Sequence, residues 1–101
     1  MAVLAIFTGD IGKDEYEALR KEVKWETDLA PGGVFHAAAL ADAGHIHAAD
    51  VWESQEALDN FVGQRLIPAF QKLKLNPPKV EVYPTHNVNA YSSVTKYVLK
   101  S

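Results

Sequence analysis

The sequence contains no cysteine, so disulfides, thiolate metal sites and a cysteine nucleophile are excluded. The lack of cysteine fits the cytoplasm, where we expect the protein to reside. Basic residues are scattered and the formal charge is -3. Because nucleic-acid phosphates require a basic surface, we expect no nucleic-acid partner. Long hydrophobic runs are lacking too: the apolar start, residues 1–10, has no basic leader and is too short for a signal peptide or a membrane span.

A GxGxxG loop, which would cradle a nucleotide phosphate, is also lacking, and we expect no cofactor. The composition is that of a globular protein, with 101 residues of which 48% are hydrophobic and 23% charged. A chain of this length forms one domain with a modest core. We expect this domain to span residues 1–88, followed by a tail over residues 89–101 that forms an arm, an extra strand or a partly disordered segment.

Six elements are predicted along the chain. Runs rich in β-forming residues and bounded by turn residues predict four strands, at residues 3–8, 34–41, 45–53 and about 80–83. Apolar residues at helical spacing predict an amphipathic helix over residues 14–25 and a longer helix that begins after the N-cap Ser54. Pro68 predicts a kink or a break in the second half of that helix. This order predicts an α+β fold, ferredoxin-like βαββαβ, with a four-stranded antiparallel sheet.

In this fold both helices cover the same face of the sheet. The other face would expose His45, His47, Ala49 and Val51, together with apolar residues of the neighbouring strands. An apolar face of that size is unfavourable in water, so we expect a homodimer in which a second copy covers it.

The turn at residues 42–44 sets the register of the second and third strands. If it is a three-residue hairpin loop with its glycine in the left-handed conformation, residue 41 pairs with residue 45 and His36 pairs with Asp50. Opposed residues on antiparallel strands share a face, so the imidazole could donate a hydrogen bond to the carboxylate. A loop of two or four residues would shift the register by one and separate the pair.

Several motifs resemble those of a known superfamily. They are Asp50-x-Trp52-Glu53-Ser54, the pair Phe35-His36, Arg65-Leu66-x-Pro68-Ala69, and Val80-Glu81-Val82-x-Pro84-x-His86-Asn87. Over residues 2–88 the chain resembles the dimeric α+β barrel superfamily, and more narrowly the small proteins related to antibiotic biosynthesis monooxygenases. This resemblance implies a homodimer and, in each subunit, a pocket between the helices and the sheet. It also implies that Ile46, Ala48, Asp50 and Trp52 face this pocket.

The superfamily includes cofactor-free oxygenases, polyketide cyclases, haem-degrading enzymes and decarboxylases, and the fold does not select among them. Haem-degrading relatives take a haem-ligating histidine from the second helix, whereas residues 55–75 contain no histidine. Two interpretations stay open. The first is an enzyme that acts on an aromatic or polyketide-like small molecule by general acid–base or cofactor-free oxygenase chemistry. The second is a non-catalytic dimeric protein that binds a small apolar or aromatic ligand.

In the enzyme interpretation, His36 is the expected general base, Asp50 is the acid that orients it, and His86 helps to position the substrate. The expected substrate contacts are Trp52, Phe35, Phe70 and Tyr83.

Some of these candidates also have a purely structural interpretation. Asp50 could be a buried acid satisfied by hydrogen bonds, and Trp52 could be a core residue. His86 could be an exposed turn residue, and Tyr16 and Tyr83 could serve in packing.

His45 and His47 have the spacing at which two imidazoles can bind one metal ion. Because no third ligand lies nearby in the sequence, we expect structural or interface histidines and no metal site.

Overall fold

The computed structural model describes residues 1–42 and 44–100. Its elements in chain order are β1 (Val3–Gly9), α1 (Lys13–Val23), β2 (Gly33–Asp42), β3 (His45–Trp52), α2 (Gln55–Phe61), a π-helical turn (Val62–Leu66), α3 (Ile67–Leu73), β4 (Lys79–Pro84) and a 3-10 helix (Ser92–Tyr97). The predicted βαββαβ order and α+β fold class are confirmed.

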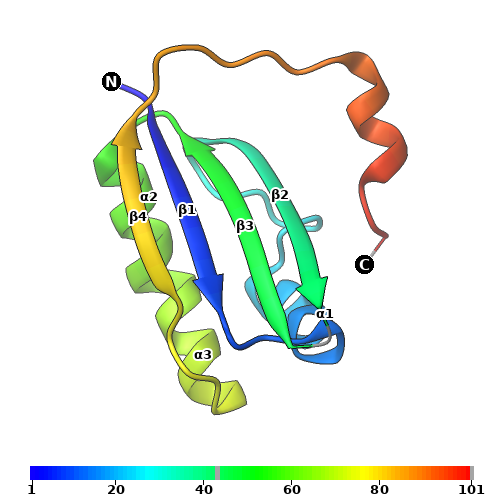
Figure 1. The fold of residues 1–101 in the computed structure, drawn as a ribbon. Coiled ribbons are helices and arrows are strands. Elements are labelled where there is room, and N and C mark those ends of the chain that lie inside the picture. The colour runs from blue at the N-terminus through cyan, green and yellow to red at the C-terminus, as the bar shows by residue number, and fades with distance from the viewer. Residues whose placement is uncertain (43, 101) are drawn as a thin grey trace.

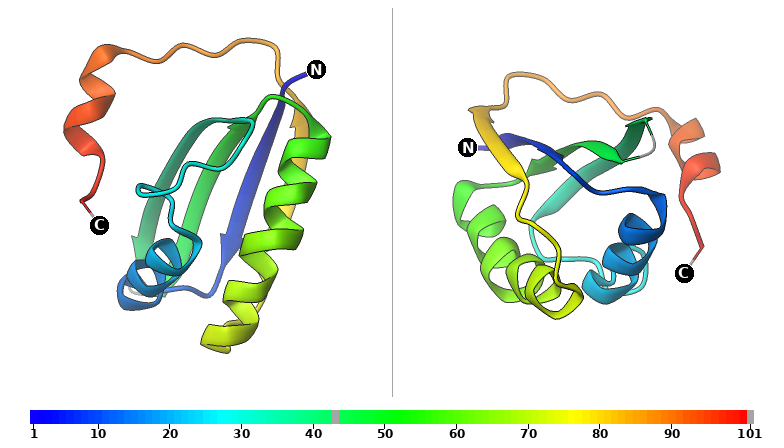
Figure 2. Two further views of the ribbon diagram at one scale, coloured as in Figure 1. Left: turned by 180° about the vertical axis from the view of Figure 1, so that it is seen from behind. Right: turned by 60° about the horizontal axis from the view of Figure 1, so that its bottom comes forward.

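The four strands form one antiparallel sheet in the order β2-β3-β1-β4. Helices α1, α2 and α3 lie against one face of this sheet, and none of them covers the other face (Figure 1, Figure 2). Within residues 1–42 and 44–100, no helix is long and apolar enough to cross a membrane.

Strand alternation decides which side chains face the helices. On β3, Ile46, Ala48, Asp50 and Trp52 are buried on the helix side, whereas His45 and His47 are exposed on the opposite side. The two motifs HxH and DxW therefore lie on opposite faces. We call the side turned away from the helices the outward face; it is made of Leu4, Ile6, Thr8, Phe35, Ala37, Ala39, His47, Ala49, Val51, Glu81 and Tyr83.

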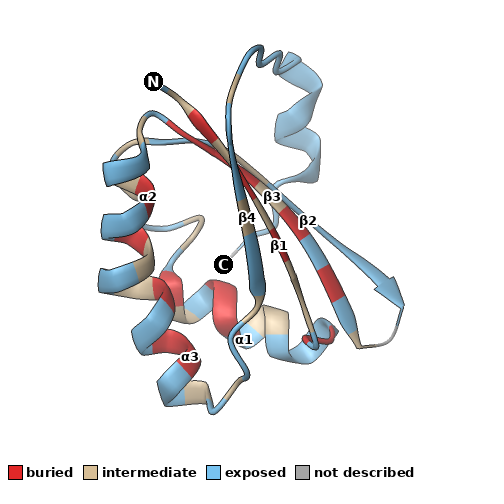
Figure 3. Ribbon diagram, turned by 60° about the vertical axis from the view of Figure 1, so that its left-hand side comes forward, coloured by how far each residue is buried: buried red, intermediate tan, exposed pale blue. Residues whose placement is uncertain are grey.

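The core lies between the helix side of the sheet and the helices (Figure 3). Its larger members are Val3, Phe7, Ile11, Leu19, Val23, Ile46, Trp52, Leu58, Phe61, Leu66 and Phe70. Burial of each such side chain contributes about 1.5–3 kcal/mol, so this single layer supplies most of the hydrophobic stabilisation.

Helix α1 begins one residue earlier and ends two residues earlier than predicted. Its first turn is capped where the carboxylate of Glu15 accepts a hydrogen bond from the backbone N–H of Gly12 at 2.9 Å. It ends at Val23 because Lys24 adopts a left-handed conformation, with φ of 63°. Trp25, which was expected inside the helix, instead lies in the following loop and packs against the core.

The second helical region begins as predicted, since the hydroxyl of Ser54 accepts a hydrogen bond from the N–H of Ala57 at 3.0 Å. The disturbance predicted at Pro68 takes the form of the π-helical turn just before it, in which the N–H of Ile67 donates to the carbonyl of Val62. Proline has no N–H for the carbonyl four residues earlier, and a π-helical turn is a common way to accommodate such a defect.

The predicted pairing of His36 with Asp50 is confirmed, as is the ladder next to it. The pairing nearer the turn differs, because Asp42 rather than residue 41 lies opposite His45. An irregularity between Leu40 and Asp42 absorbs the extra residue and keeps the rest of the ladder in the expected register. Residue 43 of the predicted loop lies outside the described residues.

Beyond β4 the chain continues as an arm, which we define as residues 86–100. It crosses the end of the sheet and descends beside β2, where it contains the 3-10 helix (Figure 1, Figure 2). All residues of the arm are exposed.

Candidate functional site

A chain of hydrogen bonds crosses the space between α1 and the sheet. The hydroxyl of Tyr16 lies 2.9 Å from Nε2 of His36, and Nδ1 of His36 lies 2.5 Å from Oδ1 of Asp50. The other carboxylate oxygen accepts a hydrogen bond from the indole N–H of Trp52 at 3.3 Å. Helix α1 and strands β2 and β3 thus each contribute one titratable group to a single network.

The chemistry of the two ends fixes the protonation pattern of His36. An ionised Asp50 can only accept, so Nδ1 of the imidazole carries the proton in that contact. The unprotonated Nε2 of a neutral imidazole then accepts the hydrogen bond from the hydroxyl of Tyr16. The basic atom of His36 therefore points away from the sheet, toward α1.

The burial of Asp50 requires hydrogen-bond donors for its carboxylate. The side chain of Asp50 is 1% exposed, and a carboxylate so far from water is costly unless it is paired and hydrogen-bonded. His36 and Trp52 together supply donors to both carboxylate oxygens. His36 itself stays 20% exposed, which leaves it accessible from one side.

Trp25 covers one face of the His36 imidazole. The two rings are stacked, with centroids 4.1 Å apart and planes 17° apart. The indole also contacts Phe61, with ring centroids 4.6 Å apart, so it is anchored on the second helical region. An aromatic face beside an imidazole stabilises the ring when it becomes a cation.

An apolar cavity of about 40 Å³ adjoins this network. It is lined by Phe7, Ile11, Tyr16, Leu19, Trp25, His36, Ile46, Ala48, Asp50, Leu66, Phe70 and Pro78. Its volume holds about one water molecule. The lining residues include no cation, so the surface suits a neutral apolar molecule rather than a carboxylate or a phosphate.

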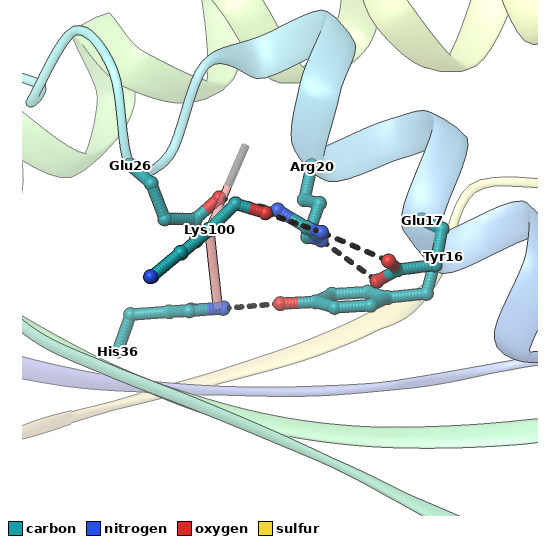
Figure 4. Close-up of polar contacts among 6 residues, drawn as sticks. All are labelled: Tyr16, Glu17, Arg20, Glu26, His36 and Lys100. Carbon is teal, nitrogen blue, oxygen red and sulfur yellow. Dashed lines mark hydrogen bonds and ion pairs between the residues drawn. The ribbon is translucent and has the colours of Figure 1, made fainter. Parts of the chain in front are cut away.

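Arg20 forms a second polar layer next to Tyr16 (Figure 4). Although nearly buried, the guanidinium donates to Glu17 at 2.7 Å, to Glu26 at 2.9 Å and to the backbone carbonyl of Lys100 at 3.1 Å. The hydrogen bond with Glu17 raises the pKa of Arg20, which stays charged.

Burial raises the pKa of Tyr16 to about 12, and the negative charges of Glu26 and Asp50 act in the same direction. The phenol is therefore protonated at neutral pH. It can donate to His36 while its oxygen remains free to accept a hydrogen bond.

The structure brings three of the predicted site residues to the cavity and separates the others from it. His36, Asp50 and Phe70 line the cavity, and Trp52 supports it by holding Asp50.

The predicted substrate contacts Phe35 and Tyr83 do not reach this cavity. Both lie on the outward face, because Phe35 precedes the inward His36 on the same strand and Tyr83 pairs with the outward Leu4. His86, expected to help position the substrate, follows β4 and is exposed in the arm.

Two residues of the network were not predicted to take part. Tyr16 was assigned to packing, although its place three residues before the buried Leu19 already indicated a side chain turned toward the sheet. Trp25 was assigned to a helix, and its contact with His36 depends on the loop that follows Lys24. In the part of the chain that the structure describes, no group of three histidine, aspartate or glutamate side chains could hold a metal ion.

No protein-family model matches the chain, and no curated protein matches it in sequence. Solved structures match its fold. A variant of SnoaB, a cofactor-independent oxygenase from Streptomyces nogalater, is similar with a TM-score of 0.67 and 16% identity, over 86% of this chain and 95% of SnoaB. A candidate antibiotic biosynthesis monooxygenase from Chloroflexus aurantiacus has a TM-score of 0.67 and 14% identity, over 89% and 98% of the two chains. A conserved protein from Methanosarcina mazei has a TM-score of 0.65 and 17% identity, over 85% and 94%. The fold is thus that of antibiotic biosynthesis monooxygenase-like proteins, as the sequence motifs predicted.

Proposed function

We propose that the protein is a small enzyme that removes a proton from an apolar or aromatic hydroxyl compound, with His36 as the general base. The observation that carries this proposal is the hydrogen-bonded chain from Asp50 through His36 to Tyr16, which ends at an apolar cavity. An imidazole oriented by a carboxylate is the usual arrangement of a catalytic histidine.

The proton would move along this chain in one direction. A substrate hydroxyl donates its proton to the oxygen of Tyr16, while the phenolic proton of Tyr16 passes to Nε2 of His36. The carboxylate of Asp50 and the ring face of Trp25 then stabilise the imidazolium that forms. The substrate keeps the electron pair of its broken O–H bond as an oxyanion. If it is electron-rich, it can itself transfer an electron to dioxygen, which would give a substrate radical and superoxide without a cofactor. SnoaB, whose fold is similar, is a cofactor-independent oxygenase.

A second candidate function is supported by the small volume of the cavity. A cavity of about 40 Å³ is well below the roughly 150 Å³ that accommodates benzene in an engineered core. An aromatic substrate therefore requires the half-buried Trp25 to move off His36. A protein that binds an apolar ligand without turnover would need the same opening but no base.

We further propose a homodimer joined through the outward face. Leu4, Ile6, Phe35, Ala37 and Ala49 form a contiguous apolar surface there that is at least partly exposed, because their strands are adjacent in the sheet. A second copy would remove this surface from water.

Oxygen uptake with 1-naphthol and 1,4-dihydroxynaphthalene as probes tests the enzymatic proposal. We expect His36→Ala to reduce the protein-dependent rate by about 10²- to 10⁴-fold, the usual contribution of a general base. The matched control is His45→Ala, which removes an exposed imidazole elsewhere on the protein and should keep the full rate. Full activity in His36→Ala would contradict the assignment of the base. Saturable binding of the probes without turnover would instead support the ligand-binding function.

A further inference from the structure

The arm is anchored at its two ends but packs against little in between. At its root, the N–H of Thr85 donates to the carbonyl of Ala2 at 2.9 Å. At its far end, the carbonyl of Lys100 accepts from the guanidinium of Arg20 at 3.1 Å. All residues from 86 to 100 are nevertheless exposed (Figure 3). The arm therefore stands away from the body of its own subunit.

Apolar residues recur at every third position of the arm. They are Val88, Tyr91, Val94 and Tyr97, and the last three span the 3-10 helix and its N-cap. Because a 3-10 helix has three residues per turn, side chains three positions apart lie on the same face. Tyr91 and Tyr97 are 77% and 81% exposed, so this apolar stripe faces water in the isolated subunit.

Exposed tyrosines in a row are costly to leave uncovered and are among the residues most enriched at protein interfaces. The arm begins where β4 ends and crosses the end of the sheet before it descends beside β2 (Figure 2). A second copy seated on the outward face would thus meet the arm along its path. The arm therefore runs next to the proposed dimer interface (Figure 1, Figure 2).

The charge of the arm fits the same partner. Lys96 and Lys100 are its charged residues, and it contains no acidic side chain. The whole chain carries a formal charge of -3, so the body of a second copy is more acidic than the chain as a whole. Opposite charges on arm and body favour the docking of one on the other.

We propose that the arm of each subunit docks on the body of the other subunit, with Tyr91, Val94 and Tyr97 as its contacts. The proposal rests on the homodimer proposed above, because the partner is a second copy of this chain. Exchange of a terminal segment between identical subunits needs no new binding surface beyond those the chain already has. The contact between Lys100 and Arg20 would hold the far end of the arm while the stripe meets the partner.

Intermolecular paramagnetic relaxation can test this directly, because the chain has no native cysteine and one introduced thiol is unique. A nitroxide on Lys96→Cys, which lies outside the stripe, is mixed with ¹⁵N-labelled protein that carries no spin label. We expect broadened amide signals on the labelled subunit. The control label on Glu56→Cys, at the start of α2 and away from the outward face, should broaden none across subunits. Sedimentation in the same buffer reports the oligomeric state.

Three outcomes are distinguishable. A dimer with broadening across subunits supports the arm exchange. A dimer whose ¹⁵N-labelled subunit shows no broadened amide signals contradicts the exchange and leaves the dimer intact. A monomer contradicts both. As a second measure, Tyr91→Ser combined with Tyr97→Ser should weaken the dimer at least about tenfold, as expected for two interface tyrosines. Ser93→Ala, also in the arm, should leave its dissociation constant unchanged.

Discussion

The two faces of strand β3 differ in how far their side chains are buried and in how their polar groups are hydrogen-bonded. On the helix side, the carboxylate of Asp50 has a hydrogen-bond donor on each oxygen, and the neighbouring side chains are buried. On the outward face, His47 is exposed, and Ala49 and Val51 lie beside apolar residues of β1 and β2. One side of the strand thus contributes to an internal polar network, and the other side contributes to an apolar surface of the sheet. Residues adjacent in sequence therefore have unrelated environments.

The largest expected effect is the loss of an indole from the helix side. Trp52 is 1% exposed, and Trp52→Ala would leave a large void and remove a donor from Asp50. We expect the free energy of unfolding to fall by about 3–5 kcal/mol, measured by chemical denaturation. Tyr83→Ala on the outward face should cost less than about 1 kcal/mol under conditions in which the protein is monomeric. Equal losses in the two variants would show that the faces do not differ in packing.

A charge placed on the outward face should act on association rather than on folding. Ala49 lies between Ile6 and Ala37 near the centre of this face, so Ala49→Glu would bury a carboxylate in the proposed dimer. We expect the dimer to weaken by about 100-fold or more, because an unpaired charge at the centre of an interface is poorly tolerated. Lys79→Gln at the rim is the matched control. Sedimentation of a tight dimer in the Ala49 variant would argue against this face as the interface.

The hydrogen-bond network should also produce a stability change at high pH. The pKa of Tyr16 in the folded protein, about 12, lies above the ordinary tyrosine value of 10.0, so the unfolded chain loses this proton first as pH rises. The contribution of the protonated Tyr16 to the free energy of unfolding is therefore complete below pH 10 and is lost between about pH 10 and pH 12. From the size of the shift we expect a loss on the order of 2 kcal/mol. In Tyr16→Phe this part of the pH dependence should be absent, and an unchanged profile would contradict the burial of the phenol.

The sequence was sufficient for the parts of the site that depend on local structure. The pairing of His36 with Asp50 follows from one hairpin and from alternation within two strands, and it is confirmed. The same alternation places Phe35 on the opposite face from His36, so its assignment to the cavity was inconsistent with the predicted strand. The face on which Tyr83 lies depends on the register of β4 against β1. These strands are far apart in the sequence, so no local pattern predicts their register.

Other parts of the site could not be predicted, because they depend on packing between elements. The contact between Tyr16 and His36 is set by the rotation of α1 over the sheet, which helical periodicity leaves undetermined within tens of degrees. Trp25 stacks on His36 only because Lys24 ends the helix in a left-handed conformation. Lysine has no special preference for that conformation. Periodicity therefore predicted a helix through residue 25, and the aromatic cover of the imidazole was missed.

The smallest expected effect comes from the exposed imidazole–carboxylate pair of His45 and Asp42, in contrast to the buried pair of His36 and Asp50. His45 lies 2.6 Å from Asp42 and 3.4 Å from Asp10, with its own side chain 58% exposed. The hydrogen bond with Asp42, followed by the charge of that carboxylate, raises the pKa of His45 above 6.5. A raised pKa means that this pair stabilises the fold below the unfolded pKa and loses its effect as the pH rises through the folded one. Because both partners are exposed to water, we expect a smaller change in stability than at Tyr16. In an NMR titration, Asp42→Asn should bring the pKa of His45 back toward 6.5. An unchanged titration would show that the contact is not populated in solution.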